Sequence, residues 1–170
     1  MFTTVGSLEA YGAPVLRREV ITNSVVSTVG DSLKVASGFI ALGTAGAAVF
    51  GHLNGHADDA QVGLTSTGVA GAELGSYTNT YTVASDNQTV AQVAAVCDIS
   101  KKTLYSADAD AALGTTTGSD LSMYHMDLVS EEQLDESTAA TTAAQYLTWG
   151  VDPNDSGNAV VSIFESQVFN

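Results

Sequence analysis

Short runs of β-forming residues separated by glycine turns restrict the fold of this chain more than any other feature. Four such runs follow one another between residues 24 and 54, and the dipeptides Gly30-Asp31 and Ser37-Gly38 and the segment 43–46 separate them. The runs are Val25–Val29, Leu33–Val35, Phe39–Leu42 and Ala47–Leu53. A spacing of roughly 8–10 residues between such runs is typical of an antiparallel barrel or sandwich.

The composition favours the same class. Charged residues make up only 14% of the chain, whereas helical proteins usually carry Glu, Lys and Arg on their exposed faces. A surface of Ser, Thr and Asn suits strands and turns. We therefore predict an all-β protein, an antiparallel β-barrel or a jelly-roll-like β-sandwich with at most one short helix. Further strands are expected at 14–21, 81–84, 89–99, 103–106, 121–129, 145–150 and 159–168.

The organisation along the chain is simple. Residues 1–20 predict an extended N-terminal arm, and residues 21–170 a single β-rich domain. A glycine-rich excursion at about 55–80 interrupts that domain. The segment 130–145 is the one place with helical composition, and a loop is the alternative there.

The net charge of −14 limits the partners. Phosphate binding needs clustered Lys and Arg, so nucleic acid is excluded as a partner, and anionic membranes are disfavoured. The charge is also uneven along the chain: residues 1–50 sum to zero, and residues 51–170 carry the whole surplus. An acidic segment of this length is expected to face solvent.

Few residues suggest chemistry. Cys97 lies in an apolar run and predicts a buried, reduced thiol, which fits folding in a reducing cytoplasm. His52 and His56 have the i, i+4 spacing of a helical zinc site, but Asn-Gly between them predicts a turn, so we expect two surface histidines. No nucleophile elbow or phosphate loop is visible. We expect no catalytic, cofactor-binding or metal-binding residues, and no targeting or membrane-spanning segment.

The stretch DADAALGTTTGSD begins with alternating acids, Asp108 and Asp110, as a calcium loop does. It has Ala at the position of the third ligand and lacks the closing Glu. These acids are therefore expected to be solvated.

Two stretches carry a family resemblance. They are VVSTVGDSLKVASGFIALGTAGAAVFGHLNG, followed by ASDNQTVAQVAAVCDISKKTLYSADADAALG, and the C-terminal MDLVSEEQLDESTAATTAAQYLTWGVDPNDSGNAVVSIFES. Their layout resembles the small head decoration (cement) proteins of tailed bacteriophages. The resemblance implies a non-enzymatic, often trimeric protein, made in the bacterial cytoplasm and bound in the virion to the major capsid protein on the outer surface of the capsid.

The resemblance assigns no individual residue a role. Charge adds an expectation: the neutral N-terminal segment faces the capsid through Arg17, Arg18 and Lys34, and the acidic remainder faces solvent. The alternative is a head- or tail-surface module that recognises a host glycan, which would need an exposed aromatic platform. Trp149 is the only Trp, and its position in YLTWGV predicts a core residue.

Overall fold

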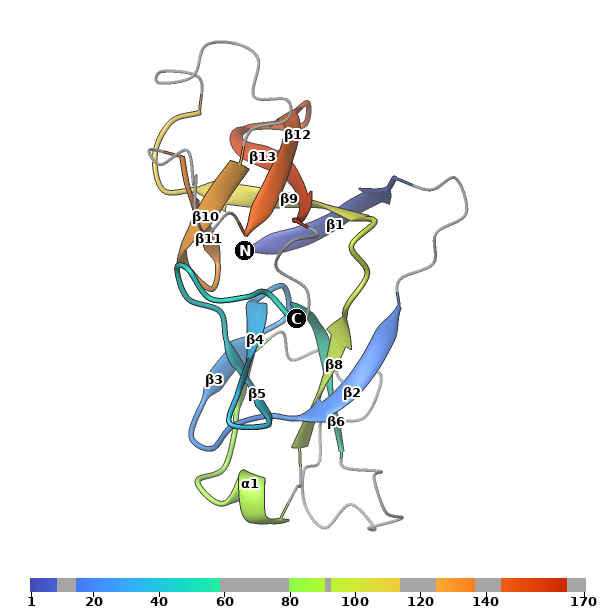
Figure 1. Ribbon diagram of the computed structural model, residues 1–170, viewed down its shortest axis with the longest axis vertical. Helices are drawn as coiled ribbons and strands as arrows, with labels where there is room; N and C mark the ends of the chain where they lie inside the picture. Colours follow the sequence, from blue (N-terminus) through green and yellow to red (C-terminus); the bar gives the residue numbers. More distant parts are fainter. Residues whose placement is uncertain (9–14, 59–79, 91–92, 114–124, 137–144, 165–170) are drawn as a thin grey trace.

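The computed structural model describes residues 1–8, 15–58, 80–90, 93–113, 125–136 and 145–164. Within these ranges the chain is built almost entirely of strands, with one short helix (Figure 1). The predicted all-β class is confirmed. The elements are β1 Phe2–Ser7, β2 Leu16–Val20, β3 Val26–Thr28, β4 Ser32–Ala36, β5 Phe39–Leu42, β6 Gly51–Asp58, β7 Thr80–Thr82, α1 Asn87–Val90, β8 Val93–Asp98, β9 Thr103–Ala109, β10 His125–Ser130, β11 Gln133–Asp135, β12 Tyr146–Asp152 and β13 Asp155–Ile163.

The larger sheet closes on itself. Its strand order is β1-β9-β11-β10-β12-β13, and β13 also pairs with β9. The strands β9, β11, β10, β12 and β13 therefore form a ring, which we call the C-terminal barrel, in the upper half of Figure 1. Strand β1 lies alongside β9. Closure leaves the ring strands without a free edge, which protects them from pairing with other chains.

A second ring occupies the lower half of Figure 1. Its strand order is β2-β8-β6-β4-β5, and a parallel bridge between Ile21, which follows β2, and Ile40 of β5 closes it. We call these five strands the N-terminal barrel. The two-stranded ribbon β3-β7 accompanies it. In the described part of the chain, no helix is long and apolar enough to cross a membrane.

Each barrel has its own apolar core, as the alternation of side chains along the strands requires. In β8, Val93, Ala95 and Cys97 point into the N-terminal barrel. One residue crosses between the cores: Val49 precedes β6 of the N-terminal barrel but packs in the core of the other barrel. The C-terminal core contains Phe2, Val49, Tyr105, Ala107, Met126, Leu128, Leu134, Tyr146, Ala159, Val161 and Ile163.

Polar contacts also join the barrels. The amide of Gln145, which is fully buried, donates to the carbonyls of Thr44 and Ala47 in the loop between β5 and β6. The backbone N–H of Gly46, in the same loop, donates to the carboxylate of Asp127 in β10. The two barrels are therefore held together by both apolar packing and hydrogen bonds.

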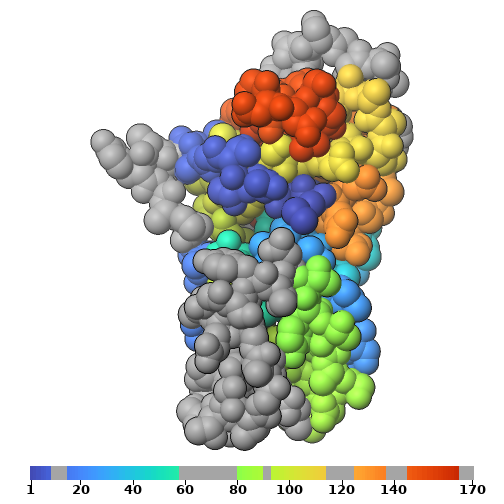
Figure 2. Space-filling model, turned by 180° about the vertical axis from the view of Figure 1, so that it is seen from behind, coloured from blue at the N-terminus to red at the C-terminus, as the bar shows by residue number. Residues whose placement is uncertain are grey.

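The described part of the expected N-terminal arm belongs to the two barrels. Strand β1 pairs with β9, and β2 pairs with β8. Phe2 is only 3% exposed, so its burial contributes to the core at the junction of the barrels. Seen from behind, the dark blue residues of β1 lie just below the red β12 and β13 and above the N-terminal barrel (Figure 2).

Three sequence expectations differ from the structure. Residues 130–136 form the end of β10, a turn and β11 instead of a helix, because Leu134 is buried and pairs with Leu128. The strand predicted at 89–99 is preceded by α1 and begins at Val93. Of the glycine-rich excursion, residues 55–58 complete β6, and residues 59–79 lie outside the described residues, as do 137–144.

Candidate functional site

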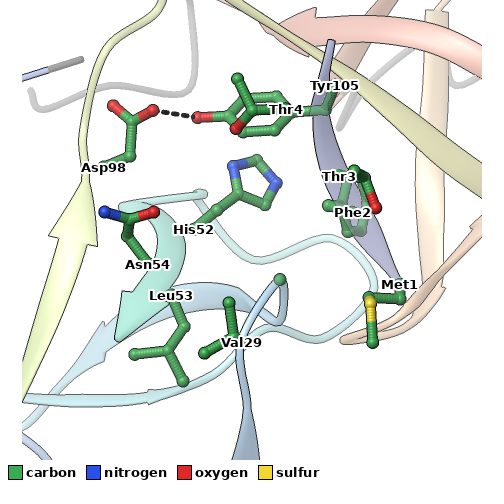
Figure 3. Close-up of a pocket in the computed structure, with 11 residues that line it drawn as sticks. Met1, Phe2, Thr3, Thr4, Val29, His52, Leu53, Asn54, Asp98 and Tyr105 are labelled. Atoms are coloured by element: carbon green, nitrogen blue, oxygen red, sulfur yellow. Dashed lines mark hydrogen bonds between the residues drawn. The ribbon is translucent and has the colours of Figure 1, made fainter. Parts of the chain in front are cut away.

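A cavity of about 300 Å³ lies at the junction of the two barrels (Figure 3). Its inner part is lined by Phe2, His52, Asp98 and Tyr105, all of which are buried. Exposed polar side chains surround its mouth: Thr3, Thr4 and Asn54. Cavities of this size are at the lower end of those that bind small molecules.

A chain of hydrogen bonds crosses the junction beside the cavity. The hydroxyl of Tyr146 lies 2.9 Å from Nε2 of His52 and 2.8 Å from the hydroxyl oxygen of Ser32. When Ser32 donates to Tyr146, the Tyr146 hydroxyl donates to Nε2, and the imidazole proton lies on Nδ1. Tyr146 belongs to the C-terminal barrel and the other two residues to the N-terminal barrel, so these bonds connect the two.

Aromatic rings enclose His52. Figure 3 shows its imidazole between the rings of Tyr105 and Phe2, whose centroids lie 3.9 Å and 4.6 Å from its own. Burial lowers the pKa of His52 to about 3. The ring is therefore neutral at neutral pH and too weak a base to take up a proton there.

Asp98 is the carboxylate of the cavity, and donors surround it. Its Oδ2 accepts hydrogen bonds from the hydroxyls of Thr103 (3.1 Å) and Tyr105 (2.9 Å), and its Oδ1 accepts one from the backbone N–H of Ser100. Burial and the neighbouring Asp98 carboxylate raise the pKa of Tyr105. The site thus combines a neutral imidazole, a satisfied carboxylate and protonated phenols, which suits structural hydrogen bonding or a small neutral guest.

The two histidines of the HLNGH motif do not meet. Both lie on β6, and a bulge between Leu53 and Gly55 separates them. His52 is at the junction, whereas Nε2 of His56 lies 2.8 Å from the hydroxyl of Ser27. The expectation of surface histidines is wrong, since both are buried. The glycines and the alternation of side chains around HLNGH do not indicate which aromatic residues cover His52.

The predicted contact residues are separated. Arg17 and Arg18 are both exposed on β2, where neighbouring side chains point to opposite faces. Arg17 forms an ion pair with Glu19. Lys34 lies on β4, which is not adjacent to β2, and donates a hydrogen bond to the Thr44 hydroxyl at 2.9 Å. The three cations share a barrel but do not form one cluster.

Three carboxylates converge in the C-terminal barrel. The oxygens of Asp110, Asp135 and Glu136 lie within 4.8 Å of one another. A shared hydrogen bond with Asp110 raises the pKa of Glu136. Oxygen ligands of this kind suit calcium or magnesium. In the sequence, Asp110 stands only with the acids close to it in the chain. The parallel pairing of β9 with β11, which brings Asp135 and Glu136 to it, is not visible in the sequence.

Trp149 is 39% exposed, so the expectation of a core position is wrong. Its indole N–H donates to the hydroxyl of Ser162 at 3.0 Å. The register of β12 with β13 shifts between Thr148 and Gly150, and Trp149 lies at that irregularity. Tyr146 and Thr148 of the same strand are buried, so the alternation of side chains along β12 places Trp149 on the outer face.

Charge differs between the two barrels. The five cations of the sequence lie in the N-terminal barrel or in the turn that leaves it: Arg17, Arg18, Lys34, Lys101 and Lys102. Residues 103–170, which supply all five strands of the C-terminal barrel, contain eleven Asp and Glu and no Lys or Arg. The step in charge therefore falls between the two barrels, near residue 102, and not at residue 50 as expected: residues 1–102 sum to −3 and residues 103–170 to −11.

Comparison of the chain with known protein families, with curated proteins and with solved structures finds no match.

Proposed function

We propose that this protein is a non-enzymatic structural protein of a bacteriophage virion, bound to the outer surface of the capsid as a decoration or cement protein. Its N-terminal barrel faces the major capsid protein, and its C-terminal barrel faces outward. The separation of charge supports this orientation, because the five cations lie in the N-terminal barrel or next to it. The capsid as the binding partner and the homotrimeric state are proposed from the family resemblance.

The charge of the chain is compatible with this role. A protein of net charge −14 is repelled by packaged DNA and by its own unbound copies, which favours solubility at high copy number. The buried polar cluster at the junction provides rigidity: Tyr146, His52 and Ser32 tie the two barrels together. A rigid body with an acidic outer half suits a protein that covers a shell.

The test uses heads that the encoding phage assembles without this protein. Purified protein is added, and occupancy is measured by electron cryomicroscopy together with the temperature at which the heads break. We expect saturable binding and a higher breaking temperature. Heads that bind no protein would contradict the proposal.

The orientation has its own test. Arg17→Ser combined with Lys34→Ser should lower occupancy at a given concentration. The control changes two exposed charges on the outward barrel, Asp110→Asn combined with Asp155→Asn, and should bind as the unmodified chain does. A reversed order of the two variants would show that the C-terminal barrel faces the shell.

A second function is favoured by one observation. The exposed Trp149 is an aromatic platform of the kind on which sugar rings stack. Because the chain has a single Trp, its fluorescence reports directly on this position. A saturable change on titration with the polysaccharide of the host surface would support glycan recognition; an unchanged spectrum would leave Trp149 to another role.

A further inference from the structure

The imidazole of His52 has one buried nitrogen without a partner in the protein. Nε2 lies beside the Tyr146 hydroxyl, whereas Nδ1 is buried and has no hydrogen-bond partner among the described residues. Because an unsatisfied buried polar atom costs free energy, native structures nearly always supply a partner, from the protein, from ordered water or from a ligand. His52 is 2% exposed and lines the junction cavity, so this cavity is where a partner for Nδ1 can lie.

The strand register places Asp98 next to this nitrogen without joining the two. His52 of β6 pairs directly with Asp98 of β8, so their side chains lie next to each other on one face of the sheet. In Figure 3 the ring nitrogen next to the point of attachment, Nδ1, lies toward Asp98, and Nε2 lies toward Phe2. The Asp98 carboxylate is bound by the three donors named above and does not reach Nδ1. A carboxylate has about four acceptor positions, so it can accept a further hydrogen bond.

A hydroxyl group fits between these two side chains. With the imidazole proton on Nδ1, a hydroxyl accepts from Nδ1–H and donates to the Asp98 carboxylate. With the proton on Nε2, the same hydroxyl donates to Nδ1 of His52. A carbonyl group cannot donate to Asp98, and an ammonium group cannot accept from Nδ1–H.

Further partners for hydroxyl groups surround the mouth of the cavity. The register of β6 with β8 shifts between Leu53 and Gly55, and Asn54 is the extra residue at this bulge. Bulges re-aim side chains and are frequent next to binding sites. The exposed amide of Asn54 can both donate and accept, and Thr3 and Thr4 of β1 add two hydroxyls.

The charge of the cavity disfavours an anionic guest. The described residues that line it include no Lys or Arg, and the Met1 ammonium donates to the Glu132 carbonyl. An anion would therefore meet the Asp98 carboxylate with no free cation to offset it. Phe2 and Val29 give the wall an apolar part against which C–H groups can pack.

We propose that the junction cavity binds a neutral monosaccharide, free or as the terminal unit of a glycan. One sugar hydroxyl lies between His52 and Asp98, and others bond to Asn54 and the threonines of β1. The volume of about 300 Å³ suits a single sugar ring, and ligand sites are common where two bodies of a protein meet. Trp149 does not line this cavity, and the proposal does not rest on the capsid role.

Saturation-transfer difference NMR of the purified chain tests the proposal with D-glucose, D-galactose, D-mannose and N-acetyl-D-glucosamine, one at a time. We expect at least one of them to bind with a dissociation constant of about 1–10 mM. Binding should move the nitrogen-15 resonance of His52 Nδ1 and leave the rings of His56 and His125 unaffected. This readout uses the unmodified chain, so it does not require a His52 variant to fold. The uronic acid of the same sugar should bind about tenfold more weakly or less.

A variant at the mouth tests the contact with Asn54. Asn54→Leu keeps the approximate size of the side chain, removes its hydrogen-bonding groups and should weaken binding about two- to tenfold. The matched control is Asn154→Leu, which changes an exposed asparagine between β12 and β13, outside the cavity, and should bind as the unmodified chain does. Circular dichroism confirms that both variants fold. An Asn54→Leu variant that binds as well as the control overturns this contact.

The remaining outcomes decide the site and the source of the sugar. A methyl glycoside that binds as well as the free sugar indicates the terminal unit of a glycan, whereas one that does not bind indicates a free sugar. No saturation transfer to any of the four sugars at about 20 mM means that the cavity holds ordered water only and overturns the proposal. Binding that leaves Nδ1 of His52 unaffected places the sugar elsewhere and also overturns it. Equal binding of the uronic acid overturns the neutral class of ligand.

Discussion

The hydroxyl of Tyr146, in the C-terminal barrel, lies 2.9 Å from Nε2 of His52, in the N-terminal barrel. Both side chains are fully or almost fully buried. Replacement of Tyr146 by Phe leaves the Nε2 atom and the Ser32 hydroxyl without this partner, and an unsatisfied buried polar group costs about 1–3 kcal/mol. We expect Tyr146→Phe to lower the free energy of unfolding in urea by that amount. Thr80→Val is the control, because it removes an exposed hydroxyl pair with Thr28 and should change stability by less than about 0.5 kcal/mol.

Phe2 gives a prediction about the first strand. Its ring is buried in the C-terminal core and stacks on Tyr146 with centroids 5.0 Å apart. Truncation of a buried Phe to Ala typically costs about 3–5 kcal/mol. We expect Phe2→Ala to lose stability in this range, whereas Val5→Ala in the same strand, 48% exposed, should change it little. Equal effects of the two variants would mean that β1 is not docked in solution.

Local signals explain which parts of the fold the sequence could predict. The four runs between residues 24 and 54 correspond to β3, β4, β5 and β6, because glycine turns and side-chain alternation act over a few residues. Ser37 and Gly38, expected as a turn, both have positive φ. These signals fix the strands and the β class, but barrels and sandwiches share them.

The remaining features of the fold depend on packing between residues that are far apart in the sequence. Nothing near Phe2 in the chain indicates β9 as its partner strand, and nothing near Val49 indicates the core of the other barrel. The two closures, between β9 and β13 and between Ile21 and Ile40, are likewise set by tertiary contacts. The cavity around His52 is lined by residues of both barrels. The HLNGH motif contains no information on these residues, so the motif alone predicted a surface position for this histidine.

Asp31 predicts a pH dependence. Burial raises its pKa to about 6 from 3.8, against the opposing hydrogen bond from the Thr28 N–H. The folded state therefore holds the proton more tightly than the unfolded state, and the free energy of unfolding falls as the pH rises from about 4 to about 6. One pKa unit corresponds to about 1.36 kcal/mol, so this ionisation lowers the free energy of unfolding at neutral pH by about 2–3 kcal/mol.

Asp31→Asn removes this ionisation and keeps an oxygen to accept from Thr28. We expect the variant to match the unmodified chain at pH 4 and to exceed its unfolding free energy by about 2 kcal/mol at pH 7. The comparison of the two chains at each pH cancels the effect of the other acids. A difference that stays constant from pH 4 to pH 7 would show that Asp31 does not titrate in this window.

Cys97 should be unreactive in the folded protein. The thiol is fully buried, and burial raises its pKa to about 12, so almost no thiolate exists at neutral pH. We expect no reaction with Ellman's reagent in buffer and complete reaction in urea, at the rate at which the chain unfolds. Lys102→Cys introduces an exposed thiol as the control and should react at once. Rapid native labelling of Cys97 would indicate frequent opening of β8.

Gly30 allows β1 to approach the N-terminal barrel. Its φ is +98°, and a Cβ atom at this position would lie 2.5 Å from the carbonyl oxygen of Phe2. Gly30→Ala therefore adds backbone strain and a clash with β1, whose Phe2 N–H also donates to the Gly30 carbonyl. Gly38→Ala separates the two costs, because Gly38 has a φ of +84° with no atom within 4 Å of the added Cβ. We expect Gly38→Ala to cost about 1–2 kcal/mol from strain alone and Gly30→Ala clearly more. Hydrogen exchange should show faster exchange of the β1 amides only in the Gly30 variant, since only there must β1 move away from its position over the junction. Equal costs and equal exchange in the two variants would mean that the contact between Gly30 and Phe2 does not hold β1 in place.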